Sequence, residues 1–154
     1  MRRSDREITD FSDILAIINS CKVIRLAMVD HGKPYLVPLN FGVIASDETL
    51  TFYCHSALEG RKIDILRENP EVFFELDTAH QLVLSDDPCH SGFRYASVMG
   101  DGVAEFLSGE EKLLALSALM RQQAGREIVF TEEQAQMVAV FAIRVKSVTA
   151  KQRK

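Results

Sequence analysis

Two adjacent cations, Arg61 and Lys62, lie where the sequence predicts the start of a helix. The first turn of a helix carries unpaired N–H groups and positive partial charge, so acidic side chains are the usual residues there. Gly60 comes directly before the pair, and Ser56 with Glu59 fits the S-x-x-E capping box of a helix N-terminus. Backbone N–H groups, a glycine and two cations are the groups that recur in phosphate sites. This stretch therefore predicts an anion site.

The same two cations have a plainer interpretation. Asp64 and Glu68 follow on the predicted helix, and exposed helical charges of opposite sign neutralise one another with little consequence. The sequence has no Walker loop and no GxGxxG motif, so a bound phosphate is not held by a familiar nucleotide loop. Arg25, on an earlier predicted strand, joins the site only if its side chain points inward. Phosphate binding and a solvated surface both stay open on this pattern alone.

Histidine and cysteine side chains offer other chemistry. His55 ends a predicted strand beside the anion site and is the candidate catalytic residue, as a proton donor or substrate contact, with a structural hydrogen bond as the alternative. His80, Cys89 and His90 are loosely spaced and lack a fourth ligand, so no metal site is expected. Cys54 is expected to be a buried apolar residue. Three cysteines, odd in number and far apart, favour a reduced, cytoplasmic setting over a disulfide framework.

Composition limits the class of protein. The chain has 154 residues, of which 47% are hydrophobic, and it contains no repeat or linker, so one domain over residues 1–154 is expected. The formal net charge of −4 and the absence of a basic stripe argue against nucleic-acid binding. No apolar run approaches the length that spans a bilayer, so no membrane association is expected.

Periodicity and turn residues place the elements around these side chains. Helices are expected over residues 10–21, from the anion site to the residue before Pro70, over 108–124 and from 131. Strands are expected over residues 23–29, 35–44, 49–55, 72–77, 93–107 and 138–148, with a loop over 85–92. Ser108 with Glu111 and Thr131 with Gln134 fit capping boxes. About six strands with few helices favour a closed antiparallel barrel with helices outside it.

Proline 38 marks a special place in the second of these strands. Pro38 has no N–H group to donate to a sheet ladder, so this residue is expected at an edge or a bulge. At such a position the backbone groups of neighbouring residues are free to face a ligand.

The sequence resembles the pyridoxamine 5'-phosphate oxidase-like flavoproteins in RLAMVDHGKPYLVPLNFGV, FYCHSALEGRKIDILRENP and PCHSGFRYASVMGDGVAEFL, which GEEKLLALSALM follows. Within them it is most similar to the 5-nitroimidazole-resistance branch. The resemblance runs in order from residue 2 to residue 151, and HSA-x-EGRK is its most specific motif. It implies a split β-barrel, mainly β with flanking helices, that forms a twofold homodimer and binds flavin mononucleotide (FMN) at the subunit interface.

The resemblance also implies a set of cofactor-binding residues. By this resemblance, the two cations hold the flavin phosphate, and the end of the preceding strand shapes the site around that phosphate. Residues 38–41 run along the isoalloxazine ring, and a later strand completes the pocket. These residues are Arg61, Lys62, His55, Ser56, Ala57, Pro38, Leu39, Asn40, Phe41, Tyr95 and Ser97, with Val98 beside them. The chain departs from the family at Val43, where an aromatic residue is common, and at Ala150, where a glycine is expected. The segment 82–92, which includes residues 88–92, is expected to close over a substrate.

The function that the resemblance implies is the reduction of small aromatic compounds, nitro compounds included, by reduced FMN. The sequence has no nicotinamide-binding motif, so NAD(P)H would bind transiently in the same site or a separate reductase would supply the electrons. Two alternatives remain: a non-catalytic flavin or haem binding module of the same fold, and a structural dimer without a cofactor.

Overall fold

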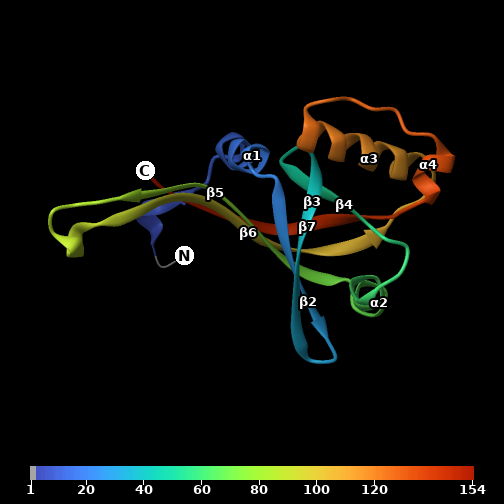
Figure 1. The fold of residues 1–154 in the computed structure, drawn as a ribbon, viewed down its shortest axis with the longest axis horizontal. Helices are drawn as coiled ribbons and strands as arrows, with labels where there is room; N and C mark the ends of the chain where they lie inside the picture. The colour runs from blue at the N-terminus through green and yellow to red at the C-terminus, as the bar shows by residue number, and fades with distance from the viewer. Residues whose placement is uncertain (1–2) are drawn as a thin grey trace.

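The computed structural model describes residues 3–154 (Figure 1); residues 1 and 2, where the expected domain and the resemblance begin, lie outside the described residues. A 3-10 turn (Ser4–Arg6) precedes the first strand, and a second one (Pro88–His90) lies between β5 and β6. The strands are β1 (Glu7–Ile8), β2 (Val23–Asp30), β3 (Lys33–Ser46), β4 (Thr49–Ser56), β5 (Glu71–Val83), β6 (Gly92–Phe106) and β7 (Ala139–Arg153). The helices are α1 (Phe11–Ser20), α2 (Arg61–Glu68), α3 (Gly109–Ala124) and α4 (Glu132–Gln136).

The strands form one antiparallel sheet that closes on itself. Its order is β1-β7-β4-β3-β2-β5-β6, and β6 pairs with β7 as well, so every strand except β1 belongs to a closed ring. Closure removes the exposed sheet edges that alternating strands would otherwise leave. This confirms the predicted barrel, mainly β with flanking helices.

Aromatic rings fill the interior of the barrel. The rings of Phe41 and Phe52 meet edge to face at 5.6 Å between centroids, and those of Phe52 and Phe74 meet at 5.0 Å. All three side chains are fully buried, as is Cys54 on the same face of β4. These contacts join β3, β4 and β5 across the core and fix the positions of the strands that carry the site.

Helices cover different parts of the barrel surface (Figure 1), with α1 and α3 on one side and α2 on the other. Helix α3 packs directly on β3. The two backbones are so close at Gly42 that a Cβ atom added there would lie 2.4 Å from the Leu119 nitrogen. Gly125, in the left-handed region at φ 66°, ends α3 as the sequence predicts. No helix within residues 3–154 combines the length and the apolar character that crossing a membrane requires.

The structure departs from the sequence-based predictions in strand length and in one of the two caps predicted for α3 and α4. Strands β5 and β7 run well beyond residues 77 and 148, and the short strand β1 was not predicted. The box at Thr131 and Gln134 is confirmed, whereas Ser108 makes no side-chain cap and Glu111 bonds Arg144 at 2.6 Å instead. A charged partner outcompetes the backbone N–H group for the Glu111 carboxylate.

Candidate functional site

Strand β3 changes its neighbour in the middle, and this change creates a free strand edge. Residues 33–40 pair with β2, from Lys33 opposite Asp30 to Asn40 opposite Val23, whereas residues 41–46 pair with β4. Among residues 3–154, the side of residues 33–40 that would face β4 therefore has no strand partner. Pro38 lies in this stretch, as predicted for a residue without an N–H group. We call residues 38–41 the β3 edge; they are the last three residues of the free stretch and Phe41, the first residue that pairs with β4.

The chain leaves β4 at Ser56 and enters α2 at Arg61, so Arg61 and Lys62 are the first two helical residues, as predicted. The predicted capping box is wrong: Gly60 is the N-cap, and no side chain accepts the first N–H groups. Gly60 has φ +130°, a conformation that glycine tolerates, and nothing lies within 4 Å of a Cβ added there. The Ile63 N–H group donates to the Gly60 carbonyl at 2.8 Å, so the N–H groups of Arg61 and Lys62 are the ones that the missing side-chain cap leaves without an acceptor within residues 3–154.

The two cations are held in different ways. The Lys62 ammonium donates to the Ser56 hydroxyl at 2.6 Å, and Ser56 is only 7% exposed. Arg61 donates from Nε to Asp30 Oδ2 at 2.9 Å, and its guanidinium lies 4.3 Å from the centre of the Tyr35 ring. Two positive groups and a hydroxyl therefore gather at the start of α2, with one carboxylate beside them.

Asp30 tunes the charge of this cluster. The hydrogen bond from Arg61, with a second from His31, lowers the pKa of the Asp30 carboxyl below its ordinary value. Asp30 therefore stays ionised at neutral pH and competes with any bound anion for Arg61. The Arg61 side chain is still 59% exposed, so the competition takes place in contact with solvent.

A carboxamide cluster fastens the β3 edge to the end of α3. Gln123 donates from Nε2 to the Phe41 carbonyl at 2.8 Å and to the Lys22 carbonyl at 3.1 Å. The Asn40 amide in turn donates to Gln123 Oε1 at 3.1 Å and to the Lys22 carbonyl at 3.2 Å. The side chain of Asn40, one of the residues that the resemblance places along the isoalloxazine ring, is thus already engaged with α3 and with the chain before β2.

His55 and Cys54 lie next to each other on β4 but face opposite ways. His55 is exposed, whereas Cys54 is fully buried in the barrel, as predicted for that cysteine. Burial raises the pKa of the Cys54 thiol to about 12, so this sulfur stays protonated at neutral pH. Of the two, only His55 can meet a ligand from outside.

Tyr95 and Ser97 lie far from the β3 edge within one chain. They belong to β6, which is three strands from β3 by either route around the ring. Ser97 lines a cavity of about 280 Å³ with Met99, Thr149 and Lys151. The Ser97 hydroxyl is buried and is the one buried side-chain polar atom within residues 3–154 that has no hydrogen-bond partner. One chain therefore presents the predicted cofactor residues as two separate groups.

Arg25 and His80, two other residues that the sequence analysis considered, lie in ion pairs elsewhere. Arg25 points away from the barrel interior and pairs with Glu75 at 2.9 Å and with Asp77, so it does not join Arg61. His80 pairs with Asp77 at 2.7 Å. Within residues 3–154 no three His, Cys, Asp or Glu side chains are grouped to hold a metal ion.

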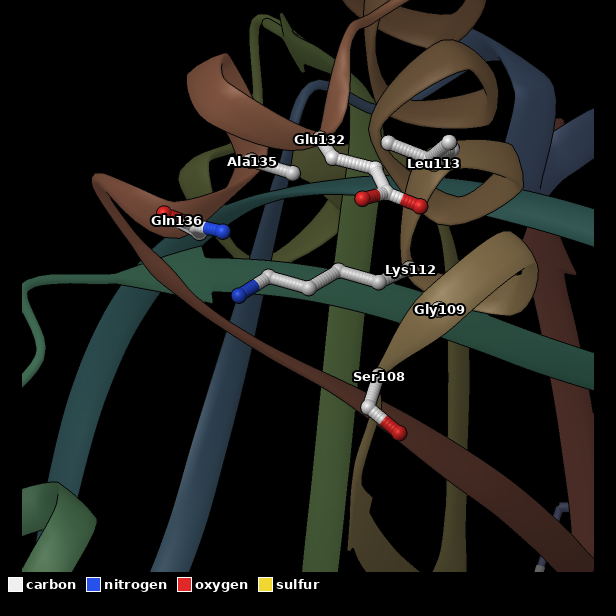
Figure 2. Close-up of a pocket in the computed structure, with 7 residues that line it drawn as sticks. All are labelled: Ser108, Gly109, Lys112, Leu113, Glu132, Ala135 and Gln136. Atoms are coloured by element: carbon white, nitrogen blue, oxygen red, sulfur yellow. The ribbon is translucent and has the colours of Figure 1, made fainter.

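A second cavity, of about 250 Å³, lies between the start of α3 and α4 (Figure 2). The side chains of Lys112 and Glu132 extend into it from the two helices. None of the residues that the sequence predicts for a site lines this cavity.

Sequence reasoning missed three residues of the site: Asp30, Tyr35 and Gln123. Asp30 and Tyr35 flank the turn between β2 and β3 and reach Arg61 only through the packing of α2. Gln123 meets Phe41 across 82 residues of sequence. Contacts between residues far apart in the sequence produce no local sequence pattern, so these three residues could not have been predicted from the sequence.

Comparison with known proteins decides the family. The sequence profile of the family described as pyridoxamine 5'-phosphate oxidase matches residues 10–152. The chain belongs to this family. A putative 5-nitroimidazole antibiotic resistance protein from Bacteroides thetaiotaomicron is 32% identical, with a TM-score of 0.82 over 95% of this chain and 86% of that chain. No curated protein matches the sequence.

More distant structures share the fold. The FAD and heme binding protein from Mycobacterium smegmatis has a TM-score of 0.82 at 17% identity, over 97% of this chain and 74% of that one. A FAD-binding protein from Mesorhizobium loti has a TM-score of 0.69 at 25% identity, over 97% of this chain and 98% of that one. Both of these structures are named as FAD-binding proteins, and the first also as a heme-binding protein.

Proposed function

We propose that the chain binds FMN between two copies and reduces small planar aromatic compounds, nitro compounds among them. The observation that carries the proposal is the start of α2. There Arg61, Lys62, the Ser56 hydroxyl and uncapped N–H groups gather, and the Arg61 guanidinium lies over the Tyr35 ring of β3. Family membership and the relative named as a putative 5-nitroimidazole antibiotic resistance protein support the choice of flavin and of nitro compounds.

The residues present fit a phosphate-bearing flavin. A dianion placed between Arg61 and Lys62 gains charge-assisted hydrogen bonds and the favourable end of the helix dipole. The open space over Gly60 admits it. The β3 edge offers backbone donors and acceptors to the polar side of a planar ring. Bound flavin would supply the electron transfer, while the protein orients the ring and controls access to it.

The divided site favours a homodimer. The Ser97 group and the Arg61 group lie on different sides of one barrel, so a single cofactor can use both only if a second copy supplies one of them. The outer surface of the sheet carries Leu36 and Phe73, which are 56% and 46% exposed and flank Ala27 from the two neighbouring strands. Exposed apolar side chains grouped in this way support the proposal of an interface with a second copy.

His55 is the proposed contact to substrate or to the ring. Its exposed imidazole stands at the end of β4, where its ring nitrogens can hydrogen-bond a substrate or the flavin. Electrons would come from NAD(P)H bound transiently at the same open site or from a separate reductase. The same exposed imidazole could instead ligate haem iron in a non-catalytic module, which is the second candidate.

Titration of the protein with FMN and with riboflavin tests the phosphate assignment, because the two flavins differ only in the phosphate. We expect Arg61→Ala with Lys62→Ala to weaken FMN binding by at least about 100-fold, the loss of two charge-assisted contacts, with little effect on riboflavin. Arg121→Ala, which removes a surface cation paired with Glu127, is the matched control. Unchanged FMN affinity in the double variant would exclude this phosphate site.

A further inference from the structure

The turn between β2 and β3 places an ionisable side chain next to the proposed phosphate site. His31 and Gly32 form this two-residue turn, between the paired residues Asp30 and Lys33, and both have positive φ, at 48° and 80°. Turns of this kind normally carry asparagine, aspartate or glycine. The turn lies on the side of the barrel that α2 covers (Figure 1). The imidazole is therefore the unusual feature of this turn.

The Asp30 carboxylate connects this imidazole to Arg61. His31 Nδ1 lies 2.9 Å from Asp30 Oδ1, while Arg61 donates from Nε and Nη2 to the other oxygen, Oδ2, at 2.9 and 2.8 Å. Asp30 is the least exposed of the three side chains, so either partner can leave it for water or for a ligand. One carboxylate thus serves two cations when His31 is protonated, and Arg61 alone when His31 is neutral.

The charged groups that face His31 come from β2 and α2. Asp30 is on β2, and Glu68 of α2 lines, with Asp30 and His31, a cavity of about 260 Å³ between the turn and that helix. The hydrogen bond to Asp30, and then the negative charge of Glu68, raises the pKa of the His31 imidazole above its ordinary value. That ordinary value is about 6.5, so His31 changes its charge within the physiological range of pH.

Protonation of His31 changes how strongly Asp30 holds Arg61. An imidazolium forms a charge-assisted hydrogen bond with the carboxylate, so Asp30 is then shared and its hold on Arg61 is weaker. A neutral imidazole leaves the full charge of the carboxylate to Arg61. A phosphate that competes with Asp30 for Arg61 therefore binds more tightly below the pKa of His31 than above it. The positive charge of the imidazolium acts in the same direction.

We propose that His31 is a positioning residue for the flavin phosphate, which acts through Asp30 on Arg61 and makes the affinity for the phosphate depend on pH. Naming the flavin phosphate as the ligand rests on the proposed function, whereas the competition between His31 and Arg61 for Asp30 does not. Binding and protonation are linked, so the phosphate favours protonation of His31 to the extent that protonated His31 favours the phosphate.

Proton NMR tests the shared carboxylate without any cofactor. The pKa of His31 is read from the shift of its Cε1 proton, which the spectrum of His31→Asn identifies. We expect Arg61→Ala to raise that pKa by roughly 0.5, because Asp30 then serves the imidazolium alone. The same change made together with Asp30→Asn should move it much less. An equal rise with and without Asp30 would mean that the carboxylate does not connect the two cations, and would overturn the proposal.

Titration with FMN at pH 6 and at pH 8.5 tests the ligand. His31→Asn keeps a residue that tolerates positive φ and removes the charge. A phosphate group changes its own charge with a pKa of about 6, so the variant is compared with the parent at each pH. From the lower to the higher pH, the parent should lose about threefold more FMN affinity than His31→Asn does, the scale of an exposed ion pair. Riboflavin should show no such difference.

His80→Asn is the matched control. His80 pairs with Asp77 at 2.7 Å, and Asp77 is likewise shared with an arginine, Arg25, which does not join Arg61. This variant should keep the pH dependence of the parent. Equal pH dependence in the parent and in His31→Asn, with FMN bound by both, would overturn the proposal, as would the same change in His80→Asn. If the parent binds no FMN, the proposed function fails, and the NMR titrations alone decide whether His31 and Arg61 share Asp30.

Discussion

Gln123→Ala should weaken flavin binding, whereas the same change at its neighbour Gln122 should not. Gln123 donates to the Phe41 carbonyl at 2.8 Å and accepts from Asn40 at 3.1 Å, both at the β3 edge, and donates to the Lys22 carbonyl before β2 at 3.1 Å. Gln122 instead donates to three carbonyls at the end of α1, those of Ile18, Asn19 and Cys21, at 3.3, 3.2 and 2.9 Å. The two variants thus remove similar bonds at different places.

The expected loss of stability is similar for both variants. A neutral hydrogen bond contributes about 1 kcal/mol net, and each amide has two N–H groups to lose, so each substitution should cost about 2 kcal/mol. For a chain of this size that lowers the melting temperature by roughly 4 to 8 °C. Only Gln123→Ala also frees the β3 edge. Ordering the freed β3 edge when FMN binds should cost about 1 kcal/mol of binding free energy, which is roughly a fivefold loss of FMN affinity.

Calorimetric melting and flavin titration of the two variants give both quantities on the same samples. Equal affinities in the two variants, with both destabilised as expected, would refute the inference that Gln123 positions the β3 edge. A fall in FMN affinity after Gln122→Ala alone would refute it as well.

Three further predictions test other parts of the structure. Asp30→Asn removes the carboxylate that competes for Arg61 and should raise the affinity for FMN several-fold while leaving riboflavin unchanged, as titration can measure. Burial raises the pKa of Cys21 to about 11 and that of Cys54 to about 12, so a thiol reagent at pH 8 should modify Cys89 alone in the folded protein and all three thiols in urea. Gly42→Ala forces a Cβ to within 2.4 Å of the Leu119 nitrogen, so urea unfolding should show a free energy of unfolding lower by about 1 to 3 kcal/mol or more. The control Gly32→Ala has no neighbour within 4 Å but has φ +80°, so it should lower the free energy of unfolding only by its backbone strain of about 1 kcal/mol.

Local signals in the sequence predicted the arrangement of residues at the start of α2. The run from Ser56 to Lys62 predicts a strand end, a glycine and two cations at a helix start, because each of these depends on residues within a few positions of one another. The capping box failed there for a local reason too. Strand β4 continues to Ser56, whose hydroxyl is bound by Lys62, and the helix starts only after Gly60.

Features that depend on distant contacts could not be predicted in this way. The free edge of β3 exists because the strand exchanges β2 for β4 at residue 41, and that exchange is set by the packing of the ring. The separation of Ser97 from Arg61 follows from strand order. The residues around Pro88 are typical of a loop, and no local pattern before them shows that β5 continues beyond residue 77. The length of β5 could therefore not be predicted from the sequence.

The most direct test of the proposed flavin chemistry is an absorbance spectrum of the purified protein, recorded without oxygen before and after NADPH and then a nitroimidazole. We expect the bands of bound flavin, their loss on reduction, and their return when the nitro compound accepts the electrons. A haem Soret band, or a protein that takes up no flavin, would contradict the assignment of the site at Arg61 and Lys62.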